Sequence, residues 1–317
     1  MPLYEETRNF DRRTLLGGAA ALAGALALGG LATRPGGALA AQNGDYPESI
    51  YSAKEYAFEG PTELAAGIAK LTMHNDGSMD HHMMLLKFAD GKSMADLGAA
   101  MQQGLAGLAT LGVAVGGPGS ASAGEQSSVL MDLAEGNYVA MCLIPDDDGI
   151  PHAAKGMVLP ITVAAAATPT ALVAPTANAT VTLTEFHFMG IPETTAAGPQ
   201  IWQVTNTGTQ LHEMGIAKLA PGVTFEMVQA ILMSTEATPA ADMATPESDT
   251  VGMATPAAAG PPPFTSIGGA APMSPGTSMW YTADLEAGDY FAICFVPDAE
   301  SGAPHFVLGM ITPFTVS

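Results

Sequence analysis

Short apolar runs bounded by Gly, Asn and Pro recur along most of the chain. Residues 290–296 are a clear example, rich in β-branched and aromatic side chains, and such runs are typical of strands. Two segments have a helical pattern instead, residues 94–104 and 225–233. They follow Ser93 and Thr224, and both residue types cap helix N-termini. The pattern therefore predicts a mostly β chain with two short helices.

The second half of the chain repeats the first. Each half opens with the motif N-x-G-x-x-x-H-x-M, at residues 75–83 and 206–214, and later presents one Cys, one His and one Met in the same order. Repetition on this scale indicates two structural units of the same kind. We predict an all-β fold of two tandem Greek-key β-sandwiches, each with one short helix.

Composition places the boundaries of these units. We expect a first domain at residues 45–164, an Ala/Pro/Thr linker at 165–179 and a second domain at 180–317. The linker composition favours an extended, flexible segment. Within the second domain, residues 234–265 form a low-complexity insertion rich in Ala, Thr and Pro, which we expect to be a disordered loop.

The first 40 residues have the features of a targeting segment. Arg12 and Arg13 form a twin-arginine pattern, a Gly/Ala/Leu run covers residues 14–32, and residues 38–40 read A-L-A, like a cleavage site. We expect export by the twin-arginine route to a periplasmic, extracellular or cell-envelope location. The alternative is an uncleaved membrane anchor, because the apolar run is long enough to span a bilayer. No stable membrane insertion is expected once the segment is removed.

The charge of the chain excludes one class of partner. It has 31 acidic and 10 basic residues and a net charge of −21, and no Arg occurs after residue 40. Nucleic-acid binding is excluded because no basic surface could displace the counterions of the phosphates.

The repeated side chains suit a metal. His81 and Met83 lie two positions apart on a strand-like segment and share one face, as their counterparts do. His82 should face away from them, and we assign it no role. The two cysteines of the chain, Cys142 and Cys294, occupy equivalent positions in strand-like runs. A disulfide would require the inner strands of both units to meet, so we expect free thiols. Soft sulfur ligands beside imidazole suit copper.

The closing motif resembles that of the cupredoxins, the blue-copper family. It reads G-x-Y-x-x-x-C at residues 288–294 and continues to His305 and Gly309-Met310, with equivalents in the first half. The resemblance covers nearly all of both halves. It implies one copper per domain, held by two His and one Cys with an axial Met. The implied ligands are His81, Cys142, His152 and Met157 in the first half, and His212, Cys294, His305 and Met310 in the second.

By this resemblance the protein would transfer electrons through type 1 copper centres to a redox partner protein of unknown identity. Copper nitrite reductases and multicopper oxidases use a His beside the Cys for further coppers. Here the residues beside the cysteines are Met, Leu, Ile and Phe, and no H-x-H pair exists. We therefore expect no catalytic copper centre and no enzyme activity. Apolar residues such as Phe295 and Phe306 would raise the potential of the second site.

Two other functions stay open. The H-x-M pairs resemble ligand elements of periplasmic copper(I) chaperones, so Met83 and Met214 could join the later His and Met in a copper(I) storage or chaperone site. The simpler interpretation is that these two methionines fill gaps in the core. The last function is that of a metal-free β-sandwich scaffold.

Overall fold

The computed structural model describes residues 46–166, 172–236 and 262–317. All described residues belong to one compact unit, Ala40–Ser317. The expected targeting segment lies outside the described residues, together with part of the linker and most of the insertion. None of the helices in the described residues is long and apolar enough to cross a membrane.

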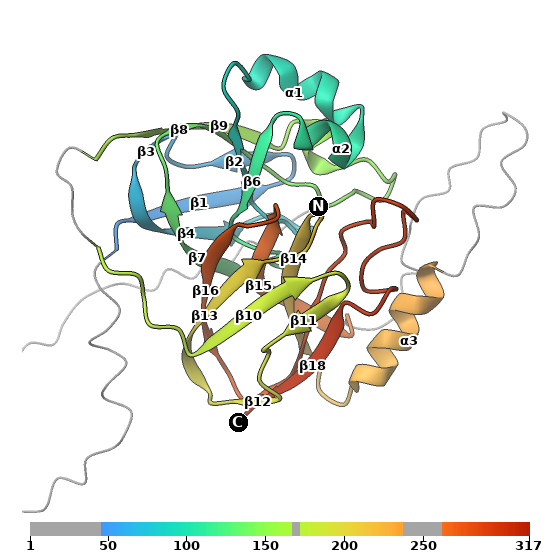
Figure 1. Cartoon of the computed structure of the whole chain (residues 1–317). Helices are drawn as coiled ribbons and strands as arrows, with labels where there is room; N and C mark the ends of the chain where they lie inside the picture. The colour runs from blue at the N-terminus through green and yellow to red at the C-terminus, as the bar shows by residue number, and fades with distance from the viewer. Residues whose placement is uncertain (1–45, 167–171, 237–261) are drawn as a thin grey trace, which may run out of the picture. The chain divides into compact units, whose positions relative to one another are not determined.

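Each half has the same succession of strands (Figure 1). The first half contains β1 (Glu48–Lys54), β2 (Ala57–Glu59), β3 (Glu63–Ala65), β4 (Gly67–Asn75), β5 (Met84–Phe88), β6 (Gly112–Gly116), β7 (Gln126–Leu133), β8 (Gly136–Met141) and β9 (Val158–Ala164). The second half contains β10 (Ala179–Thr184), β11 (His187–Met189), β12 (Thr194–Thr195), β13 (Gly198–Asn206), β14 (His212–Leu219), β15 (Phe264–Met273), β16 (Ser278–Leu285), β17 (Gly288–Ile293) and β18 (Ile311–Val316). The strands correspond in order, so that β1 is equivalent to β10, β2 to β11, and so on up to β9, which is equivalent to β18.

The strands form two sheets that run from one half into the other. The 8-stranded sheet has the order β11-β10-β13-β16-β7-β4-β1-β2, and the 10-stranded sheet has the order β12-β18-β17-β14-β15-β6-β5-β8-β9-β3. Equivalent strands meet at the centre of each sheet, where β7 pairs with β16 and β6 with β15, both antiparallel. The two halves therefore pack against each other as the subunits of a two-fold symmetric dimer do, with the same surface of each half at the interface.

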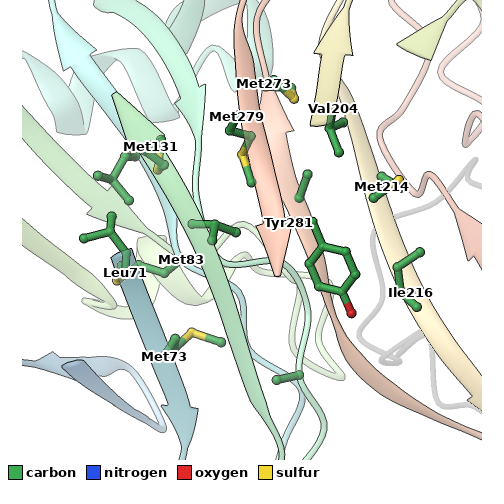
Figure 2. Close-up of a cluster of buried hydrophobic side chains, with 14 of the residues drawn as sticks. Leu71, Met73, Met83, Met131, Val204, Met214, Ile216, Met273, Met279 and Tyr281 are labelled. Carbon is green, nitrogen blue, oxygen red and sulfur yellow. The ribbon is translucent and has the colours of Figure 1, made fainter. Parts of the chain in front are cut away.

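Alternating burial explains how the strands form the core. In β1, Tyr51 and Ala53 are buried, and in β18 so are Phe314 and Val316, because successive residues of a strand point to opposite faces. The largest core cluster contains residues of both halves. Figure 2 shows part of it, with the methionines Met73, Met83, Met131, Met214, Met273 and Met279. The predicted all-β class with two tandem cupredoxin-like β-sandwiches is confirmed.

The helices differ from the prediction in extent. Helix α1 (Met94–Met101) begins at Ser93 with a complete capping box, as its sequence indicates. It ends at Met101. A second helix, α2 (Gly104–Ala109), begins at Gly104, which has a φ of 62°. The first half therefore has two helices after β5 instead of one. In the second half α3 (Phe225–Glu236) extends beyond residue 233 into the predicted insertion.

The far end of that insertion also differs, because Phe264 and Thr265 already belong to β15. A short 3-10 helix, η1 (His152–Lys155), follows the loop after β8. This turn carries the second candidate histidine of the first half.

Candidate metal centres

The side chains singled out in the sequence meet in two groups. The first group is His81, Cys142 and His152, and the second is His212, Cys294 and His305. Within each group the donor atoms all lie within 4.8 Å of one another, and all six side chains are buried. Both cysteines are free thiols, as predicted. Each half thus holds one cluster of two imidazoles and a thiol.

The Asn of the opening motif fixes the loop that carries the first His. Asn75 ends β4, and its Nδ2 donates to the carbonyl oxygens of Met79 at 2.6 Å and Ala121 at 2.7 Å. Its Oδ1 accepts from the backbone N–H of Gly77 at 2.9 Å. Asn206 makes the equivalent three bonds in the second half. Because these side chains are buried with their bonds satisfied, they hold the loop in one conformation.

Backbone hydrogen bonds tie together the Cys, the second His and the Met of each half. The Cys294 N–H donates to the carbonyl oxygen of Met310 at 3.1 Å, and the Met310 N–H donates to that of His305 at 2.9 Å. In the first half the same two bonds measure 3.3 and 3.0 Å. Met157 and Met310 are both fully buried. Their assignment as axial ligands stays a prediction, although the backbone brings them beside the Cys and the His.

The ring nitrogens nearest to the thiol face one another. In the second half, Nδ1 of His212 lies 3.0 Å from Nδ1 of His305, which lies 3.3 Å from Sγ of Cys294. The equivalent distances in the first half are 3.2 and 3.5 Å. Metal bonds to imidazole and thiolate are about 2.0 and 2.3 Å long, so donors at these separations can share one ion. The residues present therefore fit a metal.

Burial sets the protonation of the donors. It lowers the pKa of all four imidazoles, that of His305 to about 4 with a further contribution from His212. The imidazoles are neutral at pH 7, which is the form that binds metal. Burial acts in the opposite direction on the thiols: it raises the pKa of Cys142 to about 12 and that of Cys294 well above its usual value. A metal must therefore displace the thiol proton.

The residue after the first His has a structural role that sequence reasoning missed. His82 and Glu213 are equivalent, and both are buried. Nε2 of His82 accepts the backbone N–H of Leu143 at 2.9 Å, and Oε1 of Glu213 accepts that of Phe295 at 2.8 Å. Each acceptor anchors the backbone directly after the Cys. Their dissimilar side chains, at equivalent positions, hid this shared role.

Met83 and Met214 are completely buried members of the large core cluster (Figure 2). Leu71 and Met73 of β4 belong to the same cluster. This placement fits the interpretation that the two methionines fill the core. Their role as copper(I) ligands stays a prediction.

Each half thus combines a β-sandwich with a buried His/Cys/His group on the strands and loop that the motif predicts. The resemblance to cupredoxins found in the sequence is confirmed in the fold and the donor groups, and each half has one donor set of the kind that suits copper.

No family model matches the chain, and no curated protein matches it. Among solved structures, the fold is similar to an auracyanin from Roseiflexus castenholzii, with 20% identity, 37% of this chain and 96% of that chain covered, and a TM-score of 0.28. Auracyanin A from Chloroflexus aurantiacus has 21% identity, coverage of 37% and 98%, and a TM-score of 0.26. A multicopper oxidase has 13% identity, coverage of 85% and 88%, and a TM-score of 0.24. A little over a third of this chain thus matches almost the whole of each auracyanin.

Proposed function

We propose that the protein binds one copper ion in each half and transfers electrons through these two centres. The observation that carries the proposal is the duplicated group of two inward-facing Nδ1 atoms and a buried thiol, with Nδ1–Nδ1 separations of 3.2 and 3.0 Å. The proposed ligands are His81, Cys142, His152 and Met157 in the first half, and His212, Cys294, His305 and Met310 in the second. Copper bound there would supply a one-electron Cu(II)/Cu(I) couple.

The surroundings of the donors favour electron transfer. The imidazoles and the thiol are held by backbone hydrogen bonds and by buried neighbours, so the ligands would move little when the charge of the ion changes. The exclusion of water from an apolar site also tunes its potential. A carrier of this kind needs a redox partner protein and no nucleic acid, and it catalyses no reaction of its own. The absence of His beside either Cys supports this, because a second copper would have no ligand there.

The two centres should differ in potential. In the second half, the buried Phe306 follows the second His, and its ring packs edge-on against Phe295 with the ring centroids 5.4 Å apart. In the first half, Ala153 takes the place of Phe306. Because the buried Phe306 ring is larger than the Ala153 methyl group, we expect the second site to have the higher potential, which redox titration of each site alone would measure.

The location proposed for this function is outside the cytoplasm. Support comes from the twin-arginine pattern and the cleavage-like site in residues 1–40. Cell fractionation and N-terminal sequencing test this proposal. Replacement of Arg12 and Arg13 by Lys should retain the protein in the cytoplasm, whereas normal export of that variant would contradict the proposed route.

Copper titration of the purified protein tests the proposed chemistry. Two coppers per chain with an intense thiolate-to-copper(II) colour are expected. Cys142→Ser and Cys294→Ser should each remove the colour of one site and leave the other, and each variant is the control for the other. Tight copper(I) uptake without colour would support storage or chaperoning instead, and a protein indifferent to copper would leave the scaffold function.

A further inference from the structure

The turns between β1 and β2 and between β10 and β11 have an unusual backbone. Tyr56 and Phe186, at equivalent positions, have φ angles of 64° and 62°. They are the only non-glycine residues with positive φ in the part of the chain that the structure describes. A bulky aromatic side chain is strained in this region, which favours glycine, and such strain persists where a local function requires it. The same strain at both positions calls for a reason other than turn formation.

The aromatic ring of each turn lies against the second His of its metal group. Tyr56 packs edge-on against His152, with the ring centroids 5.5 Å apart and an interplanar angle of 71°. Phe186 packs against His305 at 5.1 Å and 64°. Both imidazoles are buried, whereas the aromatic rings are only partly buried. Each ring therefore lies between the second imidazole and the solvent.

The residue before the aromatic reaches the first His of the same group. Oε1 of Glu55 lies 3.7 Å from Nε2 of His81, and Oε1 of Glu185 lies 3.7 Å from Nε2 of His212. Neither ring nitrogen has a hydrogen-bond partner among the described residues, so the carboxylate is the charged group that faces it. Oε1 of Glu55 is fixed by the backbone N–H groups of Ser78 and Met79. The carboxylate thus faces the far side of the ring whose Nδ1 lies next to Nδ1 of the second His.

The Gly of the opening motif makes room for this contact. A Cβ at Gly77 would lie 2.6 Å from Oε1 of Glu55 and 2.9 Å from Nε2 of His81. A Cβ at Gly208 would lie 2.7 Å from both the Glu185 Oε1 and the His212 Nε2. The carboxylate and the imidazole therefore meet directly above each glycine. The same closely packed arrangement occurs in both halves.

We propose that each two-residue turn, Glu55-Tyr56 and Glu185-Phe186, is a cap on its metal site. The Glu is a positioning residue: its carboxylate favours the proton on Nε2 of the first His, so that Nδ1 keeps a free lone pair for the metal. The aromatic ring shields the second His from water and small anions. The metal part of this inference rests on the proposed function, but the tautomer does not require metal.

The two caps differ in one respect. The hydroxyl of Tyr56 donates to the carboxylate of Asp146, which also pairs with Lys155 at 2.6 Å. Lys155 lies over the Tyr56 ring, with Nζ 5.3 Å from the ring centroid. Phe186 has no hydroxyl for such a bond. The cap of the first half is thus fastened at its outer edge, and that of the second half is held by packing.

The tautomer is measured first, by ¹⁵N NMR of the histidine rings in the copper-free protein. We expect His81 and His212 to carry their proton on Nε2. Glu55→Gln should increase the Nδ1–H form of His81 and weaken copper binding by the first site by about 10- to 100-fold. Glu59→Gln is the matched control, because Glu59 lies in the same hairpin and pairs with Lys54 at the surface.

An Nδ1–H tautomer in the unmodified protein would overturn the positioning role, as would identical behaviour of the two variants. If the tautomers are as expected but no copper binds, the proposed function fails and this inference about the histidines stands.

The shielding role is measured by the access of azide to the copper(II) sites, followed by visible absorption and electron paramagnetic resonance. Phe186→Gly removes the ring and also relieves the backbone strain, so the chain should fold. We expect azide to perturb the second site in Phe186→Gly and to leave that site unchanged in the unmodified protein. Met189→Ala, at an exposed position of the same hairpin, should behave like the unmodified protein. Equal access of azide with and without the Phe186 ring would refute shielding.

Discussion

Glu213 offers a quantitative test of how burial controls charge beside the second site. Its carboxylate is buried, and the only hydrogen bond that the structure shows for it comes from the backbone N–H of Phe295 at 2.8 Å. Loss of hydration raises the pKa of Glu213 from 4.5 to about 7, and the bond from Phe295 offsets only part of this effect. The change to make is Glu213→Gln, which keeps the acceptor for the Phe295 N–H and cannot ionise.

The sign of the effect follows from the raised pKa. The folded protein holds the proton of Glu213 more tightly than the unfolded chain does. The corresponding stability is fully present below about pH 4.5 and is lost as the pH rises through about 7. A pKa raised from 4.5 to about 7 corresponds to roughly 3 kcal/mol of folding free energy. The stability of Glu213→Gln should not fall with pH in this way, because its side chain does not ionise.

The assay is urea unfolding of the copper-free protein between about pH 5 and about pH 8. Between these two pH values the free energy of unfolding of the unmodified protein should fall by about 2 to 3 kcal/mol relative to that of Glu213→Gln. Glu300→Gln is the control, since this exposed Glu lies in the following loop and its replacement removes the same charge. Parallel pH profiles for the unmodified protein and Glu213→Gln would refute the reasoning that burial keeps this carboxyl protonated.

Three other outcomes are expected. Burial lowers the pKa of His82 from 6.5 to about 3. The stability that the neutral imidazole contributes is therefore present above about pH 6.5 and is lost as the pH falls towards about 3. At about pH 4 the free energy of unfolding of His82→Gln should rise relative to that of the unmodified protein. Copper binding at about pH 7 should release about one proton per site, because the pKa of Cys142 is raised to about 12 and the thiol must ionise; an indicator dye in weakly buffered solution measures it. Asn206→Ala removes three hydrogen bonds of a buried side chain and should lower the free energy of unfolding by about 2 to 4 kcal/mol, measured with urea.

The sequence by itself was sufficient for the features that depend on local pattern. Apolar runs bounded by turn residues predicted the strands, and the capping signal at Ser93 predicted the start of α1. The repeated order of His, Cys, His and Met predicted two clusters, and the structure brings the His and Cys of each together. These features could be predicted because the side-chain period of a strand and the hydrogen bonds of a cap involve residues close in sequence.

Only the tertiary structure revealed the contacts between distant segments. The pairing of β7 with β16 joins the halves, and no motif in either strand announces it. The backbone bond that makes Glu213 an anchor spans 82 positions of the chain, and the contact of Phe186 with His305 depends on a positive φ at one turn residue. Such contacts depend on which strands lie side by side and on which backbone strain the packing can hold. That is a property of the whole fold, because a local sequence signal cannot encode the partner across a sheet.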